Sequence, residues 1–206
     1  WARSRGLGDV YKRQLINTEA FNCSVVFANA NTGEVLISAE ERGDKESINI
    51  DLISTRAQYE PGSSLKIFSI GLALEQGLLD EKTEYYVEDT IELIENSCQK
   101  DFKGYKGCYK DFLKHEPYNL SVKEIIERSS NVGTIIATKD LNINDLEEFL
   151  SKFGFSKRTG IELSGESKGS FDPNKTCTTC LSSLSIGYSI NVTQMQMVKA
   201  YSIIAN

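Results

Sequence analysis

Residues 59–76 read YEPGSSLKIFSIGLALEQ, and this stretch decides how the chain folds. Glu60-Pro61-Gly62 predicts a sharp turn into a new element. The segment 63–76 is apolar on nearly all sides, and Gly77 follows it as a stop signal. We therefore expect a buried helix with Ser63 at its N-terminus, where free backbone N–H groups and the positive end of the helix dipole gather. The apolar positions are Leu65, Ile67, Phe68, Ile70, Leu72 and Leu74.

Ser63 and Lys66 stand three residues apart, so on a helix their side chains share one face and the amine can reach the hydroxyl. This arrangement is that of a nucleophile with a base. A lysine amine among apolar side chains has its pKa lowered by desolvation, which is what a base working near neutral pH needs. The alternative interpretation is a helix-capping serine followed by a surface lysine.

Spacing alone does not select these residues. Ser97 and Lys100 repeat the S-x-x-K pattern in a polar stretch without helical periodicity. A second pattern, S-x-N, occurs three times: at Ser47–Asn49, Ser129–Asn131 and Ser189–Asn191. Context must therefore choose among them.

Local signals favour Ser129. A capping box at Ser121–Glu124 predicts a short helix that ends near Arg128, and a second helical run extends to Lys139. Ser129 and Asn131 would then lie at a corner between two helices. Ordinary polar linker chemistry is the alternative interpretation of this corner.

The other elements are predicted from similar signals. Residues 23–39 favour a β-hairpin turning at Asn31-Thr32-Gly33, and residues 80–119 favour loops with short strands. Asn144 is expected to cap a helix that Gly154 ends, and residues 159–169 form a strand or loop. Thr193–Gln196 predicts a capped helix whose core positions are Met195, Val198, Tyr201 and Ile204 or Ala205.

Bulk properties exclude some functions. The chain has 206 residues, a formal net charge of −6 and a pI near 5.0, which argue against a nucleic-acid partner. No stretch approaches the roughly 18 to 20 consecutive apolar residues that span a bilayer. Residues 1–14 differ in composition, with four basic residues and one acidic residue. We interpret them as a non-native, adapter-like leader, a genuine basic linker being the alternative.

The five cysteines are many for a cytosolic domain and could pair in an oxidising compartment. Cys98 and Cys108 flank a polar segment suited to a small disulfide loop. Cys177 and Cys180 have the spacing of a redox or metal-binding pair. A zinc site built from both pairs is a less favoured alternative, and we predict no metal and no organic cofactor. His115, the only histidine, excludes a multi-histidine site.

These segments together resemble the transpeptidase domain of class B penicillin-binding proteins. YEPGSSLKIFSIGLALEQG is similar to the active-site segment of that family, and RSSNVGT is similar to its second motif, in the same order and separation. The resemblance extends to the stretches SVVFANANTGEVLISA, FGFSKRTGIELSGESKG and LSIGYSINVTQMQMVKAYSIIAN. It covers nearly everything from about Phe21 to Asn206, and the division-type enzymes fit slightly better than the elongation type.

The resemblance implies a role for each motif residue. Ser63 would attack the penultimate D-Ala carbonyl of a peptidoglycan stem peptide, and Lys66 would take its proton. Ser129 would relay a proton to the departing D-Ala, and the Asn131 amide would hold the substrate backbone and orient Lys66. The Ser63 backbone N–H would supply half of an oxyanion hole. β-Lactams would acylate the same serine.

The sequence also departs from the family pattern. The third motif, Lys-Ser/Thr-Gly, is absent and is expected beyond Asn206, so residues 15–206 are interpreted as a partial transpeptidase domain that is inactive alone. The family's GYG reads Gly187-Tyr188-Ser189 here, and Gln194 replaces an expected proline. Both differences are expected to alter the scaffold and not the mechanism.

The expected fold is α/β in the broad sense: a largely antiparallel sheet with helices on both faces, like that of serine β-lactamases, truncated at its C-terminus. The expected location is the periplasmic face of the bacterial inner membrane, held by an N-terminal helix outside this sequence, beside cell-division or cell-elongation membrane proteins. One rival is a class D-like β-lactamase or β-lactam sensor domain, although SSN replaces the Ser-x-Val usual there. Another is a non-catalytic cell-wall partner domain.

Overall fold

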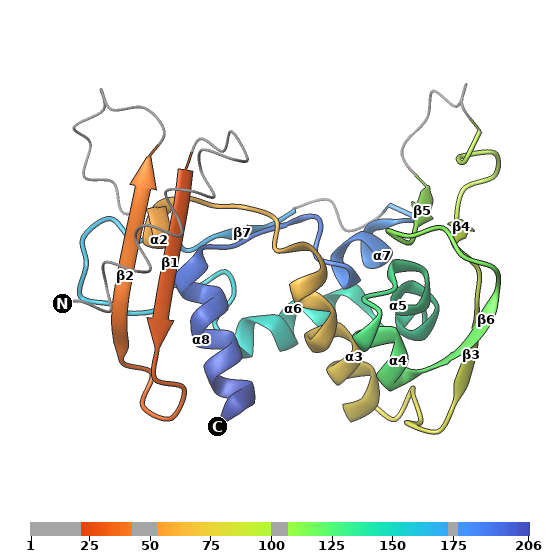
Figure 1. The fold of residues 1–206 in the computed structure, drawn as a ribbon, viewed down its shortest axis with the longest axis horizontal. Coiled ribbons are helices and arrows are strands. Elements are labelled where there is room, and N and C mark those ends of the chain that lie inside the picture. The colour runs from red at the N-terminus through yellow and green to blue at the C-terminus, as the bar shows by residue number, and fades with distance from the viewer. Residues whose placement is uncertain (1–21, 43–52, 100–106, 173–176) are drawn as a thin grey trace. The chain divides into compact units, whose positions relative to one another are not determined.

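The computed structural model describes residues 22–42, 53–99, 107–172 and 177–206 (Figure 1). These residues form two compact units. The first unit lies within Trp1–Tyr59, Phe153–Gly169 and Val192–Asn206, and the second within Glu60–Lys152 and Ser170–Asn191. The predicted leader 1–14 lies outside the described residues, as do Lys100 and the Ser47–Asn49 pattern.

The first unit contains the predicted hairpin. Strand β1 (Asn22–Ala28) pairs antiparallel with β2 (Val35–Arg42), so the hairpin begins one residue earlier and ends three residues later than expected. The Gly33 N–H donates to the Asn29 carbonyl at 2.8 Å, and Gly33 has a φ of 72°. A glycine suits this turn because it adopts the left-handed region without a Cβ clash.

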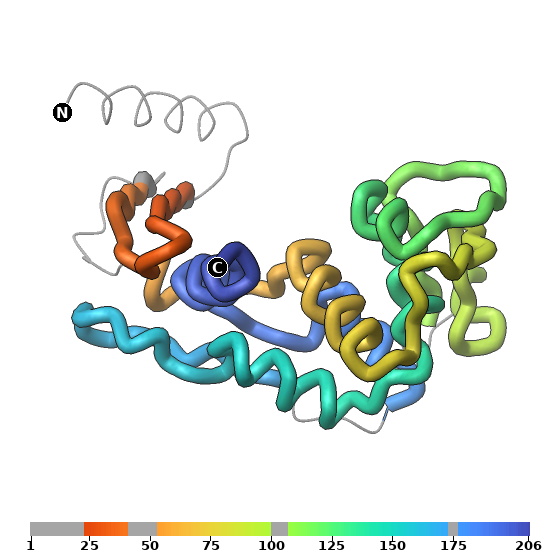
Figure 2. The backbone as a smooth tube through the Cα atoms, turned by 90° about the horizontal axis from the view of Figure 1, so that it is seen from below, coloured from red at the N-terminus to blue at the C-terminus, as the bar shows by residue number. Residues whose placement is uncertain are grey.

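Helices α2 (Ile53–Arg56) and α8 (Gln194–Ala205) both contact β1. Figure 2 looks along α8, which lies beside the hairpin. The capping box predicted at Thr193 is confirmed: its hydroxyl accepts from the Gln196 N–H, and the Gln196 side chain accepts from the Thr193 N–H.

The predicted core face of α8 is partly wrong. Met195 is buried, but Tyr201 and Ile204 are 40% and 43% exposed. The buried stripe continues through Gln196, Met197 and Ala200 instead. A hydrophobic pattern misses Gln196, which can be buried because its amide donates to the carbonyls of Lys157 at 2.8 Å and Lys168 at 2.7 Å.

The second unit contains the helix that the opening stretch predicts. Its first turn is a 3₁₀ helix, η1 (Gly62–Leu65), and α3 follows as Lys66–Glu75. Gly77 ends it with a φ of 68°, as expected. In Figure 1, α3 lies beside α4 (Val122–Glu127) and α5 (Asn131–Thr138), and the three helices contact one another. Their shared core contains Ile70, Val87, Leu120, Val122, Ile125, Val132 and Ala137.

The short strands predicted within residues 80–119 are confirmed. Strand β3 (Glu84–Val87) pairs with β6 (Tyr118–Ser121), and β4 (Thr90–Glu92) pairs with β5 (Cys108–Lys110). In a third pair, β7 (Ser170–Phe171) pairs with β8 (Ile190–Asn191), and the short helix α7 (Cys180–Ser185) lies between these two strands in the chain. Every ladder in the described residues is antiparallel and two-stranded.

Helix α6 (Ile143–Lys152) begins before its predicted cap. The side-chain oxygen of Asn142 accepts from the Asn144 N–H at 2.8 Å, so Asn142 takes the capping role that we assigned to Asn144. Two asparagines precede the apolar run, and the sequence does not say which one leaves the helix.

Both cysteine pairs form disulfides, Cys98–Cys108 and Cys177–Cys180, and Cys23 is free. The disulfide loop predicted at Cys98 and Cys108 is therefore present. Within the part of the chain that the structure describes, no group of three or more histidine, cysteine or carboxylate side chains could hold a metal ion. The same residues include no helix long and apolar enough to cross a membrane.

Two helical glycines provide a test of the packing. A Cβ at Gly133 would lie 2.9 Å from both Ile125 Cγ1 and Ser130 Oγ, whereas a Cβ at Gly71 would meet nothing within 4 Å. Glycine-to-alanine in a helix gains about 1 kcal/mol, but overpacking costs about 1–3 kcal/mol. We predict that Gly71→Ala stabilises the fold and Gly133→Ala destabilises it, as measured by urea unfolding. A stabilising Gly133→Ala would contradict the packing of α4 on α5.

Candidate active site

Ser63 lies exposed in the 3₁₀ turn that precedes α3. The turn is held from behind: the Gly62 N–H donates to the Gly187 carbonyl at 3.0 Å. Gly187 has a φ of 86°, and a Cβ there would overlap the Gly62 carbonyl. Only glycine permits this approach of two backbones, which fixes the position of the neighbouring serine.

Lys66 is the first residue of α3, and it is only 2% exposed. Its Nζ donates to the Ser129 carbonyl at 2.5 Å and to Ser129 Oγ at 3.2 Å. Burial lowers the pKa of the Lys66 amine to about 8, although the Asp111 carboxylate acts in the opposite direction. An amine with this pKa is neutral in an appreciable fraction of molecules near neutral pH, as a proton acceptor must be.

Ser129 lies in the α4–α5 corner, which we define as Arg128–Asn131. The Ser129 N–H donates to the Ile126 carbonyl and the Ser130 N–H to the Ile125 carbonyl, both at 3.0 Å. These two bonds form a Schellman motif, whose penultimate residue takes the left-handed conformation and is usually glycine. Ser129 occupies that place with a φ of 54°. Helix termination alone would favour glycine at this position, but the corner has a serine there and so carries a hydroxyl.

Asn131 is the first residue of α5, and its Nδ2 donates to the Lys110 carbonyl at 2.8 Å. The amide therefore ties the α4–α5 corner to the end of β5. Among the described residues, no hydrogen bond joins Asn131 to Lys66 or the Ser63 hydroxyl to Lys66. The structure brings Lys66 and Ser129 into direct contact. Asn131 lies in the same corner as Ser129, two residues later.

The competing serines differ in their surroundings. Ser97 lies in a turn after β4, and its hydroxyl is buried without a hydrogen-bond partner. Ser189 precedes β8 with a φ of 61°, and its N–H donates to a Glu60 carboxylate oxygen at 3.0 Å. A nucleophile needs access to substrate, so the exposed hydroxyl of Ser63 is better suited than that of Ser97.

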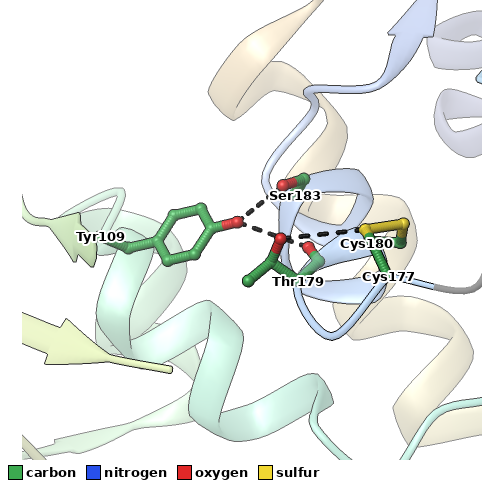
Figure 3. The surroundings of a disulfide bond; sticks show 5 residues. All are labelled: Tyr109, Cys177, Thr179, Cys180 and Ser183. Carbon is green, nitrogen blue, oxygen red and sulfur yellow. Dashed lines mark hydrogen bonds between the residues drawn. A yellow bond between two sulfur atoms is a disulfide. The ribbon is translucent and has the colours of Figure 1, made fainter. Parts of the chain in front are cut away.

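Sequence reasoning missed Asp111, which borders this site, and Tyr109, two residues before it. Asp111 follows β5 and bonds to the α4–α5 corner, and no motif marks it. Tyr109, on β5, reaches α7: its hydroxyl lies 2.7 Å from Ser183 Oγ and 3.4 Å from the Thr179 carbonyl, next to the Cys177–Cys180 disulfide (Figure 3). Both lie in the polar stretch whose spacing carries no periodic signal.

The pattern of the penicillin-binding protein transpeptidase domain matches residues 23–206, a range that contains every residue of this site. The chain belongs to the penicillin-binding protein transpeptidase family. This confirms the resemblance inferred from the YEPGSSLK and RSSNVGT segments.

Curated relatives include a penicillin-binding protein and a peptidoglycan D,D-transpeptidase. The chain is 29% identical over 196 residues to penicillin-binding protein PbpB of Mycolicibacterium smegmatis, covering 91% of this chain and 28% of that protein. It is 27% identical over 209 residues to the peptidoglycan D,D-transpeptidase FtsI of Escherichia coli, covering 94% of this chain and 33% of that protein. The chain thus spans about a third or less of the length of these relatives.

A solved structure of penicillin-binding protein 3 from Mycobacterium tuberculosis, complexed with ampicillin, matches with a TM-score of 0.76 and 28% identity. The match covers 91% of this chain and 41% of that one. The fold is therefore that of the penicillin-binding transpeptidases, with mixed helices and antiparallel strands, as predicted.

The two scaffold departures have structural explanations. Ser189 keeps the left-handed backbone that a glycine would adopt at this position. Gln194, where a proline was expected, holds β1 through its side chain: Oε1 accepts from Ser24 Oγ at 2.7 Å, and Nε2 donates to the Ser24 carbonyl at 3.1 Å. Neither change touches Lys66 or Ser129.

The left-handed backbone of Ser129 gives a stability prediction. Ser129→Gly should have a free energy of unfolding about 1 kcal/mol higher than Ser129→Ala, as measured by urea titration, because only glycine adopts positive φ without a Cβ penalty. Ser151, inside α6, is the matched control, where alanine should be the more stable replacement by about 1 kcal/mol. Equal stability of the two Ser129 variants would contradict the Schellman geometry.

Proposed function

We propose that the protein carrying this chain is a serine-type peptidoglycan D,D-transpeptidase that cross-links stem peptides through an acyl-enzyme. The observation that carries the proposal is the buried Lys66 amine, which donates hydrogen bonds to the Ser129 carbonyl and hydroxyl. Lys66 follows the exposed Ser63 by one helical turn. Membership of the transpeptidase family and the naming of relatives such as FtsI support the same activity.

In the first half-reaction, neutral Lys66 accepts the proton of Ser63 as Oγ attacks the penultimate D-Ala carbonyl. The Ser63 backbone N–H stabilises the developing oxyanion in the first turn before α3. The peptide C–N bond then breaks, and Ser129 relays the proton held by Lys66 to the departing D-Ala amine, which leaves Lys66 neutral again. An ester on Ser63 results, and an acceptor amine from a second stem peptide attacks it. Asn131 would hold the substrate backbone.

The same chemistry accommodates β-lactams, whose strained amide would acylate Ser63 in place of the D-Ala-D-Ala bond. The related penicillin-binding protein 3 from Mycobacterium tuberculosis has been solved with ampicillin. No cofactor takes part in the proposed steps, which need only proton transfer between side chains and acyl transfer to an amine.

The proposed location is the extracytoplasmic face of the inner membrane, with an N-terminal anchoring helix outside this sequence and division-type membrane proteins as partners. The two disulfides support an oxidising compartment, because such bonds are rare in the cytosol. A class D-like β-lactamase would hydrolyse the penicillin adduct rapidly, whereas the transpeptidase proposed here should keep it for a long time. A non-catalytic partner domain should form no adduct.

The nucleophile is tested by labelling the full-length protein with a fluorescent penicillin. We expect Ser63→Ala to abolish the covalent adduct and Ser97→Ala to leave it intact, since Ser63 is exposed one helical turn before Lys66, whereas the Ser97 hydroxyl is buried. Peptide mapping of the labelled wild-type protein locates the adduct. An adduct on Ser97 would overturn the assignment.

The base is tested by pH. If Lys66 must be neutral, the acylation rate should rise with pH and reach half its maximum near pH 8, where burial has placed the pKa of the amine. Lys66→Arg keeps a positive charge that does not dissociate in proteins, so its rate should fall by about 100-fold or more at every pH. Stopped-flow labelling measures both. A pH-independent wild-type rate, or a fast Arg variant, would exclude the base role.

A further inference from the structure

We propose that Asp111 is a positioning residue of this site, which fixes the α4–α5 corner in the geometry and charge environment that Lys66 and Ser129 need. The inference rests on the proposed acyl-transfer function and deepens it. It is carried by a set of hydrogen bonds that converge on one carboxylate from outside both sequence motifs.

The Asp111 carboxylate binds the corner with one oxygen and the first turn of α5 with the other. Oδ2 accepts from Ser130 Oγ at 2.7 Å, and Oδ1 accepts from the Val132 N–H at 3.0 Å. Ser130 Oγ in turn accepts from the Gly133 N–H at 2.8 Å. Two of the free N–H groups at the start of α5 are therefore capped, one by Ser130 and one by Asp111. A carboxylate at a helix N-terminus is also favoured by the helix dipole.

The residue before Asp111 adds a further tie, because the Lys110 carbonyl accepts from Asn131 Nδ2 at 2.8 Å. Lys110, the last residue of β5, and Asp111 after it thus bind three consecutive residues at the start of α5: the N-cap Ser130, Asn131 and Val132. Ser129, immediately before them, is left to turn its hydroxyl and carbonyl toward Lys66. Its left-handed backbone needs such support, since that conformation costs a serine about 1 kcal/mol.

Asp111 is itself held in place. Its N–H donates to the Asp89 carbonyl at 2.9 Å, which continues the β4–β5 ladder, and the Cys98–Cys108 disulfide links the first residue of β5 to the turn after β4. Its side chain is only 7% exposed. A buried carboxylate with this many fixed donors is a rigid reference point for α5.

His115 completes the surroundings of the carboxylate. Its Nε2 lies 3.1 Å from Asp111 Oδ2, and its Nδ1 lies 2.9 Å from the Glu116 carbonyl. Desolvation lowers the pKa of His115, but hydrogen bonds to Glu116 and Asp111 and the charges of Asp111 and Asp89 outweigh it and raise that pKa. Both ring nitrogens face acceptors, so only the imidazolium can donate to both.

The charge of Asp111 also reaches the amine. Of the charged groups in the described residues, including those on the helices packed against α3, Asp111 is the one that acts on Lys66, and it raises the pKa that burial lowers. Removing this charge should therefore move the acid limb of the acylation rate to lower pH, because Lys66 would lose its proton more easily. A residue that only capped α5 would have no such effect.

The experiment measures penicillin acylation of the full-length protein from about pH 6 to 9 in three variants. Asp111→Asn keeps the shape of the side chain and removes the charge, Asp111→Glu keeps the charge and displaces it, and Asp89→Asn removes a neighbouring carboxylate that does not act on Lys66. For Asp111→Asn we expect the acid limb to move down by roughly half a pH unit or more, with a limiting rate about 10-fold lower. Asp111→Glu should keep the wild-type limb but lose rate, and Asp89→Asn should match the wild type.

The outcomes separate the two levels of the proposal. A wild-type protein without an adduct on Ser63 would remove the proposed function and Asp111's role with it. A labelled wild type with an unmoved limb in Asp111→Asn would reduce Asp111 to a helix cap and overturn the inference. If Asp111→Asn does not fold, Asp111→Glu decides, because a wild-type acylation rate in that variant would show that the carboxylate's position does not matter.

Discussion

The bond between the buried amine of Lys66 and the backbone of Ser129 is the interaction on which the rest of the site depends. A lysine that is 2% exposed must be hydrogen-bonded, because an unpaired buried amine costs several kcal/mol. The partner is a carbonyl of the α4–α5 corner, so α3 and this corner must pack at a fixed distance. The buried Lys66 amine needs a hydrogen-bond acceptor, and a helix corner offers a free carbonyl. This explains why the second motif, Ser129–Asn131, lies at such a corner.

The corner itself gives up stability for this arrangement. A Schellman motif ends most easily in glycine, yet Ser129 holds the left-handed place with a hydroxyl that bonds to Lys66. The strain is local and small, and the bonds from Asp111 to Ser130 and Val132 offset it. A strained backbone conformation persists when the surrounding contacts hold it in place. Here Asp111, which follows β5, supplies those contacts to the residues next to Ser129.

Sequence reasoning reached those parts of the molecule that local signals determine. The apolar run after Ser63, the capping box at Ser121 and the glycine stop at position 77 each lie within a few residues of what they specify. The 3₁₀ turn at Ser63 and the burial of Gln196 were missed, because each depends on a partner far along the chain: Gly187 for the first, Lys157 and Lys168 for the second.

The polar segments 88–99 and 107–116 were the part of the sequence hardest to interpret, and this follows from how they are stabilised. They have few apolar positions to form a periodic pattern, and a disulfide and tertiary hydrogen bonds supplement hydrophobic packing there. Tyr109 bonds toward α7, and Asp111 bonds toward α5 from the same strand end. Tyr109 and Asp111 are two residues apart, so on an extended strand their side chains point to the same side. From that side they link α7 and α5 to the β4–β5 ladder. A segment without a periodic sequence pattern can therefore help to fix the site through hydrogen bonds to distant helices.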